Sequence, residues 1–146
     1  RSAKCPARAP ARGPTGPRPG YRDGVARLLI IEDDAAIRTM LIRALRERGH
    51  AVAAGPRALG GLESALSERT DLVVLDPPRK GCDSATLSAV AAMNPKRIVM
   101  VSCDTATMAR DFKALAELGY TPKIAQPVDM FPRTANVECA AVLVRR

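Results

Sequence analysis

A short apolar run that ends in a carboxylate and two prolines constrains the fold of this chain most strongly. The run is Leu72-Val73-Val74-Leu75, and Asp76-Pro77-Pro78-Arg79-Lys80-Gly81 follows it. Branched apolar residues bounded by chain-breaking residues are typical of a buried strand in a parallel sheet. Open α/β sheets bind ligands at the carboxyl ends of their strands, so we expect Asp76 to lie at a functional edge.

Segments on both sides of this run alternate between strand and helix patterns. Apolar runs predict strands at 26–31, 50–54, 72–75, 97–101, 120–125 and 137–144. Helical spacing of apolar residues predicts a helix from the cap Asp34 to Gly49, and further helices at 58–68, 84–93 with Ser84 as cap, and 105–118. A loop is expected at 127–134. This order predicts a mostly parallel sheet with right-handed crossovers.

Length and composition favour one domain. A chain of 146 residues with 47% hydrophobic residues can bury one core. We therefore expect a single α/β domain at 25–146, folded as a doubly wound three-layer sandwich.

The net positive charge is concentrated near the N-terminal end of the chain. The net charge is +8, but residues 1–22 hold six basic residues and no acid, and the rest of the chain holds 17 basic and 15 acidic residues. Residues 1–24 are rich in proline and glycine and lack apolar periodicity, so we predict a disordered basic tail. Such a tail either binds nucleic-acid phosphate non-specifically or has no function of its own.

Cysteine and histidine content argues against structural zinc. The four cysteines form no CxxC pair, and the chain has one histidine, whereas structural zinc sites need clustered Cys and His ligands. No apolar run reaches transmembrane length, and no signal-peptide core is visible. We therefore expect no membrane segment and a location in the reducing cytoplasm.

Two motifs in the first half of the domain, residues 25–76, point to one family. LLIIEDDAAIRTMLIRALRERGH and DLVVLD resemble the receiver domain of bacterial response regulators. The resemblance implies that Glu32 and Asp33 bind Mg²⁺ and that Asp76 is phosphorylated. Acids near the start of a helix also interact favourably with its dipole, so a purely structural role stays open for Glu32 and Asp33.

Three ordered motifs in the second half, residues 71–146, point to a different family. They are LDPPRKG at 75–81, VSCDTATMARDF at 101–112 and QPVDMFPRTANVE at 126–138. Together they resemble the catalytic carboxyl end of the RNA 5-methyluridine (uracil-5-) methyltransferases, which use S-adenosylmethionine. The resemblance implies an RNA-methylating enzyme whose substrate is a uridine of ribosomal or transfer RNA.

The methyltransferase resemblance implies roles for three residues. Carbon 5 of uracil is too weak a nucleophile to take a methyl group unaided, so a thiolate first adds to carbon 6. By position in the motifs, Cys103 is this nucleophile and Glu138 is the base that removes the C5 proton. Asp76 would line the pocket shared by the methyl donor and the target uracil. Cys103 also has the alternative of a small apolar residue at a strand end.

The donor site that this resemblance implies is incomplete in the sequence. Family members bind S-adenosylmethionine on a glycine-rich turn after the first strand, with an acid after the second. Here IIEDDAA contains no glycine, and AVAAGPRA contains no acid. The sequence therefore predicts weak or no donor binding by this chain, or a partner that completes the site. A phosphorylated receiver that binds Mg²⁺ is the alternative function.

The two resemblances agree on one feature of the sheet. In both families the first strand lies beside the strand that ends at the position of Asp76. We therefore expect a Rossmann-like methyltransferase and flavodoxin-like hybrid with strand order 2-1-3-4-6-5, its last strand antiparallel, and Asp76 at the crevice.

Overall fold

The computed structural model describes residues 24–56, 70–130, 132–134 and 137–146. The predicted tail, apart from Gly24, and the predicted helix at 58–68 lie outside these ranges. The described elements are β1 (Arg27–Glu32), α1 (Ala35–Arg46), β2 (Ala51–Gly55), β3 (Leu72–Asp76), α3 (Ser84–Ala92), β4 (Arg97–Ser102), α4 (Thr105–Glu117), β5 (Tyr120–Val128) and β6 (Glu138–Arg145).

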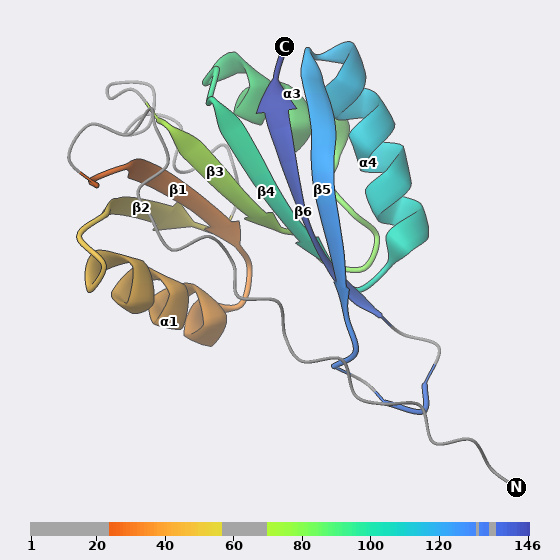
Figure 1. The fold of residues 1–146 in the computed structure, drawn as a ribbon, viewed down its shortest axis with the longest axis horizontal. Helices are drawn as coiled ribbons and strands as arrows, with labels where there is room; N and C mark the ends of the chain where they lie inside the picture. Colours follow the sequence, from red (N-terminus) through yellow and green to blue (C-terminus); the bar gives the residue numbers. More distant parts are fainter. Residues whose placement is uncertain (1–23, 57–69, 131, 135–136) are drawn as a thin grey trace, which may run out of the picture.

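The strands form one sheet in the order β2-β1-β3-β4-β6-β5, which confirms the predicted order. The pairs β1–β2, β1–β3 and β3–β4 are parallel. Strand β6 is antiparallel to both of its neighbours, β4 and β5, as predicted. The carboxyl ends of β1, β3 and β4 and the start of β6 therefore lie along one edge of the sheet (Figure 1).

The described helices cover both faces of the sheet, which confirms a three-layer sandwich (Figure 1). Successive strand side chains point to opposite faces, so Leu28 and Ile30 pack with residues of α1, whereas Leu29 packs on the side of α3 and α4. In the part of the chain that the structure describes, no helix is both long enough and apolar enough to cross a membrane.

Side chains of aspartate begin all three described helices. Asp34 accepts hydrogen bonds from the Ala36 and Ile37 amides, at 2.8 and 2.9 Å, which confirms its predicted role as cap. The predicted cap Ser84 is wrong: Ser84 is the first helical residue, and Asp83 before it accepts from the Thr86 amide at 2.6 Å. Aspartate and serine cap helices equally well, so two adjacent candidates cannot be told apart by residue type.

Strand β5 is longer than predicted. It continues past Ala125 to Val128, and Val128 pairs with Glu138 of β6, so a loop from residue 127 is wrong for its first two residues. Pro127 lies within the strand. Proline is tolerated here because β5 is an edge strand whose outer side has no neighbour in the sheet.

Candidate active site

Two acids from neighbouring strands lie side by side at the functional edge. Glu32, the last residue of β1, pairs in register with Asp76, the last residue of β3. The side chain of Glu32 is buried, with the residue 3% exposed, and Asp76 is half-buried. Parallel strands bring their carboxyl ends to the same edge, which explains how residues so far apart in the sequence form a pair.

A cavity opens beside this pair. Its volume is about 450 Å³, which lies in the range of small-molecule sites in proteins. Glu32, Asp33 and Asp76 line it from the strand ends, and the loop after β3 lines it with Pro77, Pro78 and residues 80–82. The cavity therefore presents carboxylates on one side and the backbone of the PPRKG loop on another.

The pKa of Asp76 is raised to about 7. Burial contributes most, followed by the hydrogen bond and negative charge of Glu32 and then by the charges of Glu138 and Asp33. Two carboxylates in contact cannot both ionise without strong repulsion, so such pairs hold a proton at higher pH than a single carboxylate does. Asp76 therefore carries a proton for much of the time near neutral pH.

Glu32 has one oxygen without a partner. Its Oε1 accepts a 2.8 Å hydrogen bond from the Asp34 amide. Its Oε2 is buried and has no hydrogen-bond donor among the described residues. A buried carboxylate oxygen is costly without a donor, and a proton on the neighbouring Asp76 would supply one.

The predicted nucleophile and base lie close together at the same edge. Ser102 of β4 is paired with Cys139 of antiparallel β6. Cys103 directly follows Ser102, and Glu138 directly precedes Cys139, so both lie at this end of the strand pair. The charge of Glu138 acts on Asp76, so the structure brings the three sequence-predicted residues to one edge. Cys103 and Glu138 are not among the described residues that line the cavity.

Metal binding by Glu32 and Asp33 gains no support from the described residues. Both acids lie beside the cavity, but within residues 24–56 and the later described ranges no three His, Cys, Asp or Glu side chains are arranged to hold a metal ion. The acids are instead engaged with Asp76 and with the start of α1.

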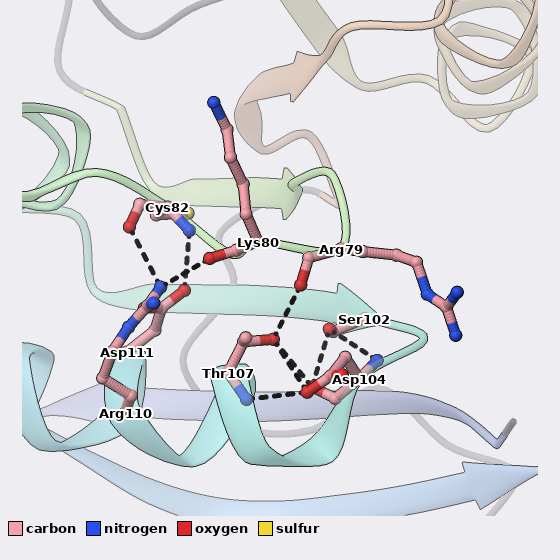
Figure 2. A network of polar contacts seen from close by, with 8 residues as sticks. All are labelled: Arg79, Lys80, Cys82, Ser102, Asp104, Thr107, Arg110 and Asp111. Atoms are coloured by element: carbon pink, nitrogen blue, oxygen red, sulfur yellow. Dashed lines mark hydrogen bonds and ion pairs between the residues drawn. The ribbon is translucent and has the colours of Figure 1, made fainter. Parts of the chain in front are cut away.

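Sequence reasoning missed two residues of α4 that hold the cavity loop. Arg110 and Asp111 hydrogen-bond to the backbone of residues 80–82 (Figure 2). Both belong to the motif VSCDTATMARDF. Asp111 falls on the buried face of the helix together with Met108 and Leu115, and a charged residue at such a position was the signal that could have indicated this pair.

Comparison with known proteins decides between the two resemblances. The profile of the tRNA (uracil-5-)-methyltransferase family matches residues 43–146. The chain belongs to the tRNA (uracil-5-)-methyltransferase family. The match begins well before the first methyltransferase motif and includes part of the stretch that we compared with receivers. The receiver resemblance gains no support from any of the comparisons described here, so we do not retain it.

Curated relatives agree with this family. An uncharacterized RNA methyltransferase of Geobacter sulfurreducens is 61% identical over 79 residues, which are 54% of this chain and 16% of that protein. An uncharacterized RNA methyltransferase of Bacillus cereus is 56% identical over 75 residues, which are 51% of this chain and 16% of that protein. The chain thus spans about a sixth of the length of these relatives.

Solved structures agree on the fold. The tRNA (uracil-54, C5)-methyltransferase of Pyrococcus abyssi, in complex with S-adenosyl-L-homocysteine, has a TM-score of 0.57 at 24% identity and covers 84% of this chain and 35% of its own. The 1,6-didemethyltoxoflavin-N1-methyltransferase of Burkholderia thailandensis has a TM-score of 0.57 at 13% identity and covers 82% of this chain and 71% of its own. The fold is a Rossmann-like methyltransferase fold.

Proposed function

We propose that this chain is the catalytic segment of an S-adenosylmethionine-dependent RNA (uracil-5-)-methyltransferase, and that residues 25–146 form its single domain. One observation supports this most strongly: Cys103 and Glu138 directly flank the paired residues Ser102 and Cys139, at the sheet edge where β3 ends with Asp76. These three residues come from three separate family motifs. Their convergence at one sheet edge is what a shared active site requires.

Each of the two catalytic residues has a separate task. The thiolate of Cys103 adds to carbon 6 of the uracil ring, and the new carbon–sulfur bond makes carbon 5 nucleophilic. S-adenosylmethionine, when bound, supplies a methyl group activated by its positively charged sulfur. Glu138 then accepts the C5 proton, and the carbon–sulfur bond breaks to release Cys103 as a thiolate. Cys103 lies two residues before α4 begins, and a helix N-terminus stabilises nearby negative charge.

The cavity suits the cationic part of the donor. The buried residue Glu32 lines the cavity, and a sulfonium or ammonium group there would compensate the negative charge of its carboxylate. We assign Glu32 and Asp76 to this contact. Asp33 is exposed at the rim of the cavity.

The turn after β1 does not suit the donor's carboxylate. Helix N-termini bind anions through free amide groups, but the side chain of Asp34 already occupies the Ala36 and Ile37 amides at the start of α1. A second anion would also be repelled by Asp34. We therefore expect weak donor binding by this chain alone, and tighter binding where a partner supplies the missing turn.

Methyl transfer to RNA tests the proposal. The 146-residue chain is incubated with methyl-labelled S-adenosylmethionine at millimolar concentration and with uridine-containing ribosomal or transfer RNA, and the nucleosides are then identified by mass spectrometry. We expect labelled 5-methyluridine from the wild-type chain and none from Cys103→Ser. Absence of product from folded wild-type protein, at donor concentrations that saturate its binding in calorimetry, would contradict the proposal.

A further inference from the structure

Side chains of α4 hold the loop after β3 by its backbone. Thr107 Oγ1 donates to the Arg79 carbonyl at 3.1 Å, and Arg110 Nη2 donates to the Lys80 carbonyl at 2.9 Å and to the Cys82 carbonyl at 3.3 Å (Figure 2). In the opposite direction, the Cys82 amide donates to Asp111 Oδ2 at 2.8 Å. All of these contacts are with the main chain of the loop, so they fix its path whatever its side chains are.

Asp111 is the buried centre of this network. The residue is 1% exposed, and its Oδ1 accepts from Arg110 Nε at 3.0 Å and from Nη2 at 2.7 Å. A buried carboxylate is tolerated only when its charge is paired and its oxygens accept hydrogen bonds. Removal of the loop from α4 would leave Asp111 Oδ2 without the Cys82 amide, so the free energy of this contact resists loop displacement.

Gly81 shows how closely the loop approaches the pair. A Cβ atom at Gly81 would lie 2.3 Å from Arg110 Nη2 and 2.7 Å from Asp111 Oδ2. The φ angle of Gly81 is +78°, in the left-handed region that glycine adopts most easily. The loop therefore lies directly against the Arg110–Asp111 pair, with no room for a side chain between them.

The same helix is fixed to the strand end that carries the predicted nucleophile. Asp104 caps α4, and its carboxylate accepts from the Thr107 amide at 2.9 Å. The hydroxyl of buried Ser102 donates to the Asp104 carbonyl and accepts from the Asp104 amide, both at 3.1 Å (Figure 2). These two bonds join the residue before Cys103 to the residue after it. Helix α4 thus contacts the cavity loop along one turn and continues from Cys103 at its start.

We propose that Arg110 and Asp111 are positioning residues, which set the distance between the cavity wall at residues 77–82 and Cys103. The two residues touch neither nucleotide nor donor; they act through the loop backbone. Their catalytic consequence rests on the proposed methyltransferase function, whereas their hold on the loop does not. Reacting groups displaced by about 1 Å can lose roughly 100-fold in rate, so a loop that drifts from α4 would slow the reaction.

Hydrogen exchange tests the hold on the loop without any activity. Arg110→Ala is the first variant because its side chain is 56% exposed, and it removes both hydrogen bonds to the buried Asp111 Oδ1; Asp111→Asn is the second and removes the buried charge itself. Lys113→Ala, an exposed substitution on the same helix, is the matched control. We expect the amides of residues 80–82 to exchange at least about tenfold faster in both variants, with the amides of β3 and β4 unchanged. Unchanged exchange at residues 80–82 would overturn the proposal.

Steady-state kinetics test the consequence for the reaction. We expect kcat of Arg110→Ala to fall by about 10- to 100-fold while KM for RNA changes less than about threefold. Arg110→Lys should recover only part of kcat, because one ammonium group cannot bridge two carbonyls and a carboxylate as the guanidinium does. Lys113→Ala should match the wild type. A raised KM with unchanged kcat would contradict a positioning role.

The two tests separate this proposal from the proposed function. If the wild-type chain transfers no methyl group, the proposed function fails, and the catalytic role of Arg110 and Asp111 fails with it. Hydrogen exchange at residues 80–82 still decides whether the two residues hold the loop.

Discussion

Ser102 and Cys139 are partners across the antiparallel strands β4 and β6. Cys103 directly follows Ser102, and Glu138 directly precedes Cys139, so both residues lie at this end of the β4–β6 pair. The proposed nucleophile from one motif and the proposed base from another thus flank one strand pair, which a point substitution in either residue leaves intact.

Replacement of Glu138 by Gln should trap the enzyme on its RNA. Without the base, the methylated adduct keeps its C5 proton and the carbon–sulfur bond to Cys103 cannot break. We expect a protein–RNA complex that survives denaturing electrophoresis and requires S-adenosylmethionine. Glu117→Gln, an exposed substitution at the end of α4, is the control and should form no such complex. Full turnover by Glu138→Gln would show that another group removes the proton.

Asp76 should make the free energy of unfolding depend on pH. Its pKa is about 7 in the folded chain against 3.8 ordinarily, so between these values the folded state retains a proton that the unfolded state loses. The free energy of unfolding should therefore fall as pH rises from about 4 to about 7, and change little above that range. Asp76→Asn should flatten this slope, as measured by urea unfolding at several pH values.

The control for this prediction is Asp129→Asn, an exposed carboxylate that is not among the residues lining the cavity, which should keep the wild-type slope. Asp34 and Asp104 affect the pH dependence of the free energy of unfolding in the opposite sense, because backbone hydrogen bonds lower their pKa. Their stabilising effect is lost only as pH falls below the ordinary range of aspartate. An identical slope in Asp76→Asn and the wild type between pH 4 and 7 would contradict the raised pKa of Asp76.

Gly81→Ala should destabilise the chain more than Gly119→Ala. Both glycines have positive φ, at +78° and +96°, so each substitution costs about 1–2 kcal/mol of backbone strain. A Cβ at Gly119 meets nothing within 4 Å, whereas at Gly81 it meets Arg110 and Asp111. We expect Gly81→Ala to cost about 1–3 kcal/mol more in chemical denaturation. Equal costs would indicate that the loop is free to move away from α4.

Cys82 should react far more slowly with alkylating reagents in the folded chain than in the unfolded chain. Burial, followed by the charges of Asp111 and Asp83, raises its pKa to about 12. Alkylation requires the thiolate, and at pH 8 roughly one thiol in 10⁴ would be ionised at this pKa. We expect iodoacetamide to modify Cys82 at least about 100-fold more slowly in the folded chain than in guanidinium. Comparable rates in both states would contradict the burial and charge around this residue.

The strands were predictable because their apolar runs are short and uninterrupted. The strand order was predictable as well, since both family resemblances place the first strand beside the one that ends at Asp76. The local sequence does not predict that the last three residues of β5 belong to the strand, because their pairing with β6 keeps them there despite Pro127. The cap of α3 was assigned one residue late, since Asp83 and Ser84 are both good capping residues.

The predicted site residues Asp76, Cys103 and Glu138 come from motifs, and the structure brings them to one edge. Two other features depend on contacts between distant residues. The raised pKa of Asp76 depends partly on its contact with Glu32, which the β1–β3 register sets. The bond between Cys82 and Asp111 joins residues 29 apart in the sequence, and no local pattern specifies such a pair.

RNA containing 5-fluorouridine tests the central proposal most directly. Fluorine at carbon 5 cannot leave as a proton, so once a methyl group has been transferred the carbon–sulfur bond remains. We expect the wild-type chain, with S-adenosylmethionine, to form a covalent RNA adduct that peptide mass spectrometry maps to Cys103, and Cys103→Ser to form none. A folded wild-type chain that binds the donor and yet forms no adduct, or forms it through another cysteine, would contradict Cys103 as the nucleophile of a uracil-5 methyltransferase.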